Sequence, residues 1–281
     1  MYLRLNRSIF IALMIAAGVI CAFSQIPTTT TPKSEPPPKP TVKTTPTPDA
    51  KGAAPKQITP ETVVETALIF AYAYPGGRAT LNQIRKTTLE RGKATFTSAE
   101  GKSSSTYQRY IIRGETVGKE KIRLDQDFPN AKYSLVYEED KIYGIFNNSV
   151  FAPREDAAKS FENQIVHGIE PLLRYKEDGS TLEMGAREKI EGVDFYVIDL
   201  TDKKERKTRY YVSAKSFRVM MLTYEDGGVK YKRKFYDYNI AQGTLVPYQT
   251  VLWADDKKVE ETEIGTITFG QKVDEELFKA G

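Results

Sequence analysis

Few side chains in this chain could do chemistry on a bound substrate. His167 is the only histidine and Cys21 the only cysteine among the 281 residues. Because a metal site normally needs three or four protein ligands, His167 supplies at most one of them. The sequence has no nucleophile elbow, zinc-protease helix, phosphate-binding glycine loop or dinucleotide fingerprint. We therefore expect neither a metal nor a cofactor.

Carboxylates are the remaining candidates, because a pair of them can hydrolyse a glycosidic bond. They occur in short clusters, and each cluster coincides with an expected turn or an exposed strand face: Glu138-Glu139-Asp140, Asp255-Asp256 and Glu260-Glu261. A glycosidase pair drawn from these clusters is an alternative that the sequence leaves open. The more economical prediction is a protein that is not an enzyme.

Positive charge is concentrated in the first part of the chain. The formal net charge is +4; residues 1–24 hold two arginines and no acid, and residues 25–57 hold five lysines against two acids, which leaves −1 for the rest. A nucleic-acid-binding domain is usually basic, with clustered Lys and Arg. We expect no nucleic-acid partner, and we interpret the run Lys230, Lys232, Arg233 and Lys234 as the solvated face of a strand.

The first 24 residues have the pattern of a signal peptide. Arg4 and Arg7 precede an apolar stretch, and Ala22-Phe23-Ser24 places small residues where a signal peptidase reads them. The apolar stretch, residues 9–20, is shorter than the roughly 20 residues that span a bilayer. We expect cleavage after Ser24 and a periplasmic protein. Lipidation of Cys21, or an uncleaved anchor, are the alternatives.

Residues 25–57 are expected to form a disordered linker ahead of a single folded domain. The segment holds nine of the fifteen prolines, interleaved with Thr and Lys. This composition favours polyproline II and buries no core. The folded domain is then expected at residues 58–281, and we expect it to be a monomer.

From residue 192 onward the sequence predicts one β-strand after another. Val, Ile, Thr, Tyr and Phe are enriched in runs with alternating polar residues, and turn sequences such as Glu225-Asp226-Gly227-Gly228 separate the runs. This is the pattern of antiparallel hairpins. The expected strands are 193–200, 208–214, 217–225, 229–240, 244–254 and 259–273.

The first part of the domain is predicted to combine helices with further strands. Thr59 can cap a helix that begins at Pro60, and Pro75-Gly76-Gly77 ends it. A second helical region, residues 154–175, is broken near Gly168 and Pro171. The expected strands are 94–98, 107–113, 119–128, 133–138, 141–147 and 181–190.

These elements predict a mainly β (α+β) fold. A sheet of about eleven antiparallel strands does not stay flat, because the twist of its strands curls it. We expect a strongly curved antiparallel sheet that forms a half-open β-barrel. The helices are expected to cover its concave side and to leave an apolar space between.

Four local patterns in the second half of the domain carry a family resemblance. They are EGVDFYVIDLTDK (191–203), RYYVSAKSFRVMMLTYED (209–226), FYDYNIAQGTLVPYQTVLW (235–253) and EIGTITFGQKVDEELF (263–278). In these patterns and in its organisation over residues 60–278, the chain resembles the LolA/LolB-type lipoprotein carriers. The last pattern matches the family's closing turn at Asp274, Leu277 and Phe278. None of the four is a catalytic motif.

The resemblance implies a carrier that takes an acylated lipoprotein or another lipid from one membrane and releases it at another. Its partners would be that cargo and the donor and acceptor membrane proteins of the envelope. Because each methylene exposed to water costs about 0.8 kcal/mol, the hollow that holds the acyl chains must be apolar. The residues that we predict to line it are Phe161, Ile165, Phe195, Val197, Tyr211, Val219, Met221, Tyr231, Phe235, Val251 and Trp253.

The resemblance also implies an arginine on an early strand that holds the helical lid shut through backbone contacts. Arg109 and Arg113, on the second expected strand, are the candidates, and Arg85 is a further choice. An alternative function on the same scaffold is a lipid-sensing or protein-docking module of the envelope, similar to RseB, with or without a membrane tether.

Overall fold

The computed structural model describes residues 58–279. The signal peptide, Cys21 and the linker expected within residues 1–57 lie outside the described residues. The described chain begins with a continuous helical run, α1 (Pro60–Thr62), η1 (Val63–Leu68) and α2 (Ile69–Tyr72). Thr59 caps this run as expected, because its hydroxyl accepts a hydrogen bond from the Thr62 amide at 3.2 Å. The helix α3 (Gly77–Ile84) was not predicted.

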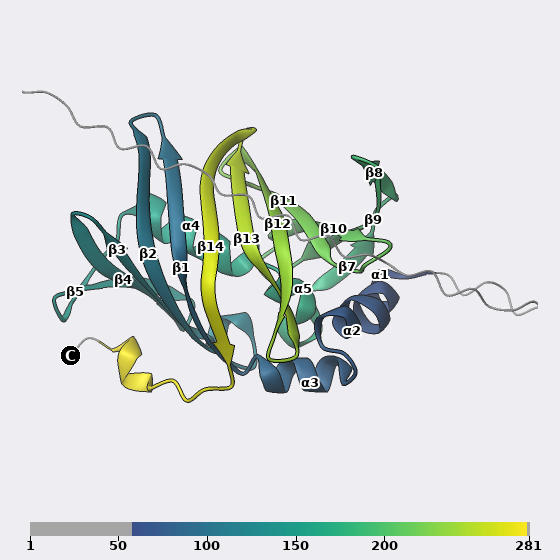
Figure 1. Ribbon diagram of the computed structural model, residues 1–281, viewed down its shortest axis with the longest axis horizontal. Helices are drawn as coiled ribbons and strands as arrows, with labels where there is room; N and C mark the ends of the chain where they lie inside the picture. Colours follow the sequence, from purple (N-terminus) through teal and green to yellow (C-terminus); the bar gives the residue numbers. More distant parts are fainter. Residues whose placement is uncertain (1–57, 280–281) are drawn as a thin grey trace, which may run out of the picture. The chain divides into compact units, whose positions relative to one another are not determined.

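In the described residues, fourteen strands form one open antiparallel sheet, which confirms the predicted mainly β class and curved half-barrel (Figure 1). More strands are present than expected, because β6 is a short additional strand and residues 181–190 divide into two. The strands are β1 (Thr87–Ser98), β2 (Gly101–Ile112), β3 (Lys121–Phe128), β4 (Ala131–Glu138), β5 (Lys141–Phe146), β6 (Ser149–Phe151), β7 (Thr181–Met184), β8 (Glu188–Ile190), β9 (Val193–Thr201), β10 (Lys207–Ser213), β11 (Val219–Asp226), β12 (Val229–Ala241), β13 (Thr244–Ala254) and β14 (Lys257–Phe269).

The order of the strands explains why helices lie across the sheet. From edge to edge the order is β6-β5-β4-β3-β2-β1-β14-β13-β12-β11-β10-β9-β7, and β8 also pairs with β9. The strands β6 and β7 are therefore at opposite edges although they follow one another in the sequence. The segment between them has to cross one face of the sheet, and Figure 1 shows its helices behind the strands.

This crossing segment consists of α4 (Glu155–Val166), α5 (Glu170–Leu173) and α6 (Tyr175–Asp178). It is the second helical region that the sequence predicts, and its break lies at His167–Ile169 as expected. Pro171 lies in the first turn of α5, where its missing amide hydrogen is tolerated. We call α4, the break and α5 (residues 155–173) the lid.

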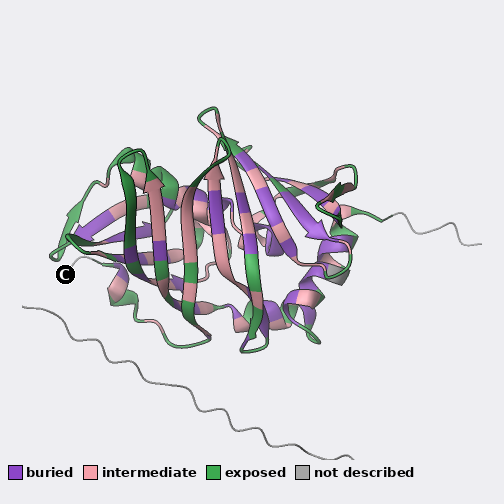
Figure 2. Ribbon diagram, turned by 45° about the horizontal axis from the view of Figure 1, so that its top comes forward, coloured by how far each residue is buried: buried purple, intermediate pink, exposed green. Residues whose placement is uncertain are grey.

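The largest apolar core lies on the face of the sheet that the helices cover. It joins α2 and α5 to strands β9 to β12, with Ile198, Tyr210 and Leu222 fully buried. Burial is denser along β9, β10 and β11 than along β14, where most residues are half-buried or exposed (Figure 2). The helix-covered side of the sheet is thus filled at one end and less completely filled toward β14.

The C-terminus packs on the first half of the sheet. A short 3-10 helix, η3 (Glu275–Phe278), begins after Asp274, whose carboxylate accepts a hydrogen bond from the Glu276 amide at 3.0 Å. Phe278 is buried against Val136 and Ile145, with Leu277 beside them. The closing turn that the sequence predicts is therefore an anchor for the end of the chain.

Candidate functional site

A cavity of about 210 Å³ lies between the lid and the middle of the sheet. Strands β1 to β3 and β12 to β14 form one wall, and α4, the break and α5 form the other. The apolar part of the wall consists of Ile111, Ile122, Phe161, Ile165, Ile169, Phe235, Val246, Ile264, Ile267 and Phe269. This cavity is the candidate for the apolar space that the sequence predicts beneath the helices.

Three of the predicted lining residues border this cavity. Phe161 and Ile165 project from α4, and Phe235 projects from β12. Val219 and Tyr231 lie on the same face of the sheet but outside the cavity, within or against the packed core. The ring of Tyr231 stacks on Tyr224 with centroids 4.8 Å apart. These two residues stabilise the sheet next to the cavity and do not line it.

The other six predicted residues lie on the opposite face of the sheet. Residues directly opposite each other on antiparallel strands share a face, and one row of such partners runs Val197, Tyr211, Met221, Lys234 and Val251. The neighbouring row, which includes Tyr210 and Arg233, contacts the lid. The sequence predicts that the following six residues face the lid, but they lie on the other face of the sheet: Phe195, Val197, Tyr211, Met221, Val251 and Trp253.

Burial on both faces explains this difference. Phe195, Val197, Tyr211 and Met221 form a second, smaller apolar cluster, so both parities of β9 and β10 look like core in the sequence. In addition, the pairing of β10 with β11 shifts between Tyr211 and Val212. Such a bulge reverses the side-chain alternation, so Met221 and Val219 join different clusters although they are two residues apart.

The cavity wall also carries charge. Four arginines and three glutamates line it, an excess of one positive charge: Arg85, Arg109, Arg113, Arg233, Glu90, Glu170 and Glu260. Buried charges are usually paired, because an isolated charge is costly to remove from water. The partners of these arginines within residues 58–279 therefore show which arginines contact the lid and which one is free to pair with a ligand.

Three of the arginines contact side chains of the lid: Arg109 from β2, Arg113 from just after β2, and Arg85 from the end of α3. Arg109 donates to Gln164 Oε1 on α4 at 2.9 Å and lies 3.4 Å from Glu90. Arg113 forms an ion pair of 2.8 Å with Glu120 and lies 3.5 Å from Glu170 on α5. Arg85 pairs with Glu170 as well. All three candidate arginines thus contact side chains of the lid, and their role in holding it shut stays a prediction.

Glu170 is the carboxylate on which two of these contacts converge. Burial alone would raise its pKa, but the guanidinium groups of Arg113 and Arg85 outweigh that effect and lower the pKa to about 2. Arg85 is in addition fixed by Thr244 Oγ1 at 3.0 Å and by the Leu245 carbonyl at 2.7 Å. The sheet therefore holds α5 through an ionised, hydrogen-bonded group.

The backbone of the lid is held at its break by two residues that the sequence did not single out for this role. Arg233 Nη1 donates to the carbonyl of His167 at 2.9 Å, and the Tyr210 hydroxyl donates to the carbonyl of Gly168 at 2.8 Å. A signal for Arg233 was present: Tyr231, Arg233 and Phe235 share one parity, and Lys230, Lys232 and Lys234 share the other. Only the lysines form the solvated side of that run.

His167 itself is buried at the break. Its ring stacks on Tyr224 with centroids 3.9 Å apart, and Nδ1 shares a hydrogen bond of 2.7 Å with the Thr208 hydroxyl. Burial, together with the positive charges of Arg233 and Arg206, lowers the pKa of His167 to about 3. The imidazole is therefore neutral at ordinary pH, and it packs the lid against β10 and β11.

Comparison with solved structures identifies the architecture. The chain is similar to a LolA superfamily protein of Nitrosomonas europaea, with a TM-score of 0.56 and 12% identity over 79% of this chain and 98% of that one. It is also similar to a DUF1329 family protein of Desulfovibrio piger, with a TM-score of 0.50 and 15% identity over 69% and 90% of the two chains. The chain has the LolA superfamily fold.

A putative outer membrane lipoprotein-sorting protein domain of Vibrio parahaemolyticus is also similar, at 14% identity over 68% of this chain and 88% of that one, with a TM-score of 0.46. Comparison with protein-family models and with curated proteins found no match. At these identities the likeness concerns the LolA fold, and the side chains of the cavity are this chain's own.

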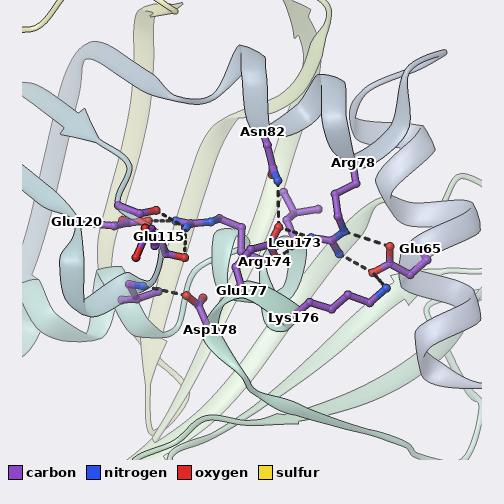
Figure 3. Close-up of polar contacts among 12 residues, drawn as sticks. Glu65, Arg78, Asn82, Glu115, Glu120, Leu173, Arg174, Lys176, Glu177 and Asp178 are labelled. Atoms are coloured by element: carbon purple, nitrogen blue, oxygen red, sulfur yellow. Dashed lines mark hydrogen bonds and ion pairs between the residues drawn. The ribbon is translucent and has the colours of Figure 1, made fainter.

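A network of ion pairs and hydrogen bonds surrounds Arg174 and Arg78 at the α5 end of the lid (Figure 3). Arg174, between α5 and α6, pairs with the buried Glu120 and donates to the Gly114 carbonyl at 2.7 Å. Arg78 on α3 joins Glu65 to Glu177 and also donates to the Leu173 carbonyl at 2.9 Å. This end of the lid is held by several charged contacts, whereas α4 contacts the cavity mainly through Phe161, Gln164 and Ile165.

Two further observations concern the described residues alone. Between residues 58 and 279, no helix combines the length and apolar character needed to cross a membrane. The same residues contain no group of three or more His, Cys, Asp or Glu side chains arranged to hold a metal ion.

Proposed function

We propose that the protein is a non-catalytic carrier that binds the acyl chains of a lipoprotein or lipid beneath its lid and moves them between membranes. The observation that carries this proposal is the cavity between α4 and the sheet, whose wall includes Phe161, Ile165 and Phe235. An acyl chain leaving a bilayer needs an enclosure of this kind, since each methylene exposed to water costs about 0.8 kcal/mol.

The size of the cavity fits a closed state of such a carrier. Its volume of about 210 Å³ is below the roughly 300–1,000 Å³ of common small-molecule sites. Cargo with several chains would require the lid to move outward. The most buried ion pairs, those of Glu170 and Arg174, lie at the α5 end, whereas the Glu162–Arg206 pair of α4 is about one quarter exposed; Gly168 lies at the break between α4 and α5. In this proposal α4 moves and α5 stays.

The proposed setting is the periplasm, reached through the signal peptide expected at residues 1–24. Donor and acceptor membrane proteins of the envelope are the proposed loading and unloading partners. The fold supports this setting only by analogy, since it is shared with a LolA superfamily protein.

Lipid transfer by the purified protein tests the proposal. Native mass spectrometry should detect bound lipid, and a fluorescent fatty acid should move from donor to acceptor vesicles faster with the protein than without it. Ile165→Glu, which places a charge in the cavity wall, should slow transfer at least about tenfold, because a charge in an apolar site is strongly disfavoured. Ser160→Glu, at an exposed position of the same helix, should transfer like the wild type.

Two results would reject the carrier. One is a protein that binds no lipid and takes up no fatty acid. The other is stable binding of an envelope protein with no lipid moved, which would favour the docking alternative.

A further inference from the structure

Arg233 differs from the other arginines in the cavity wall. Its side chain is buried, with 6% of the residue exposed, and it lines the cavity. Its Nη1 donates to the His167 carbonyl. Among residues 58–279, no carboxylate oxygen lies within 4.0 Å of its guanidinium nitrogens, the distance that defines an ion pair. By contrast, the glutamate partners of Arg85, Arg109 and Arg113 are Glu170, Glu90 and Glu120.

An unpaired buried cation calls for an explanation. A guanidinium carries five N–H donors, and one carbonyl accepts only a small part of that capacity. Burying the charge without a counter-ion costs several kcal/mol. An anionic group that enters the cavity would supply the missing partner, and the flat guanidinium fork suits the two oxygens of a carboxylate or phosphate.

We propose that Arg233 is the head-group subsite of the cavity and that its ligand is a single-chain amphiphile with an anionic oxygen head group. This inference rests on the proposed function and specifies its cargo. The shared chemistry is a carboxylate or phosphate at one end of a hydrocarbon chain.

The arrangement of the wall supports this assignment. Arg233 contacts the C-terminal end of α4, and Phe235 follows it on the same face of β12. Ile165 and Phe161 lie farther back along α4; at 1.5 Å per residue, Phe161 is about 9 Å from His167 along the helix axis. A chain whose head pairs with Arg233 can therefore run along α4 over apolar side chains. The volume of about 210 Å³ favours one chain over several.

Competition with a neutral fluorophore tests the subsite. The purified protein is loaded with N-phenyl-1-naphthylamine and titrated with dodecanoate, dodecyl phosphate or 1-dodecanol, which have the same chain. At least one of the anionic compounds should displace the fluorophore at a concentration about tenfold or more below that of 1-dodecanol, as expected for a hydrogen bond between charged groups. The carboxylate and phosphate arms show which head group is preferred.

Two variants assign the preference to Arg233. Arg233→Met keeps much of the side-chain volume and should reduce the difference between anion and alcohol to about twofold or less, whereas Arg233→Lys should keep part of it. The matched control is Arg209→Met on β10, two strands away in the sheet, whose arginine points away from the lid and pairs with Asp199 at 2.7 Å. Arg209→Met should retain the full preference. Thermal unfolding confirms that each variant is folded.

The outcomes separate the two proposals. If 1-dodecanol competes as well as dodecanoate and dodecyl phosphate on the wild type, the subsite is wrong and the carrier stands. The same holds if Arg233→Met folds and keeps the preference. If the wild type binds neither the fluorophore nor any of the three amphiphiles, the proposed function fails together with the subsite. If Arg233→Met does not fold, Arg233→Lys takes its place, and an undiminished preference in that variant would reject the subsite.

Discussion

At the scale of single residues, the break in the lid is held by groups that are buried and polar. His167, Arg233 and Tyr210 meet there, and each makes a hydrogen bond to the lid or from it. Hydrogen bonds between buried polar groups are strong, and a further charge that has no partner there is costly. A proton on His167 would be such a charge.

The pH dependence of stability tests this role of His167. Its pKa is lowered from 6.5 to about 3 in the folded protein, so between these values the unfolded chain binds more protons, and stability falls as pH falls. The contribution is at most about 1.4 kcal/mol per pH unit. In His167→Gln, the free energy of unfolding measured with urea should therefore decline less steeply between pH 6.5 and 3.

Because the chain has a single histidine, no other imidazole contributes to that difference. Equal slopes for the wild type and His167→Gln would show that His167 is not held neutral at the break.

At the scale of elements, the two helices of the lid differ in how they are attached. The α5 helix is held by the ionised Glu170 between Arg85 and Arg113, and Arg174 follows immediately. The α4 helix borders the cavity through two apolar side chains and the Arg109–Gln164 hydrogen bond. On its other side, Glu162 pairs with Arg206 at 2.8 Å and Asn163 donates to Asp226 at 2.8 Å, and both partners lie near the surface. In the proposed function, the lid opens at α4 and α5 is its pivot.

Removing the charge of Glu170 should loosen the pivot. Glu170→Gln leaves Arg85 without its carboxylate partner and leaves Arg113 with Glu120 alone. We expect a loss of roughly 2–4 kcal/mol at neutral pH, since breaking a buried pair is strongly destabilising. The folded pKa of about 2 lies below the ordinary value of 4.5, so this stabilisation is present above pH 4.5 and disappears as pH falls toward 2. Urea unfolding at several pH values measures the difference.

Glu155→Gln is the control for that series, because Glu155 is an exposed acid in the first turn of α4. It should change stability by about 1 kcal/mol or less. A similar loss in both variants would contradict the pivot.

At the scale of the whole domain, the sheet is completed by strands that are far apart in the sequence. The central strand β1 pairs with β14, so Thr88 lies opposite Phe269 and Gly92 opposite Ile264. This pairing joins the two halves of the sheet and brings β1, β2 and β14 into one cavity wall. A bulge between Arg91 and Gly92 lies within it.

Gly92 is required by close packing at this junction. A Cβ placed there would lie 2.1 Å from the Glu263 carbonyl oxygen and 2.8 Å from the Tyr107 ring. Gly92→Ala should therefore destabilise the domain by about 1–3 kcal/mol, as overpacking does. Gly265→Ala on the paired strand is the matched control, because the corresponding Cβ lies 3.6 Å from the Arg91 carbonyl oxygen, an ordinary contact. Thermal unfolding of both variants measures which loses more stability. If Gly265→Ala lost as much as Gly92→Ala or more, close packing at Gly92 would not be required.

Short-range sequence patterns were sufficient to predict most helices and strands. The Thr59 cap, the hairpins of the second half and the break at Gly168 follow from capping, alternation and turn residues that act within a few positions. The helix α3 was missed because Gly76 and Gly77 favour the end of a helix, yet Gly77 begins a new one. The strand β8 and the extra residues at the start of β1 depend on partners elsewhere in the sheet.

The sequence by itself determined the class of the fold, the two-part lid and the apolar character of the strands, because each is encoded over short distances. Three of the lining residues predicted from the sequence, Phe161, Ile165 and Phe235, border the cavity. Only the tertiary structure decided which face of each strand meets the lid, since both faces of β9 and β10 are apolar and one bulge reverses the alternation. The ion pairs of Arg85, Arg109 and Arg113, and the lack of one at Arg233 among residues 58–279, arise where distant strands and helices pack. No local pattern records that geometry.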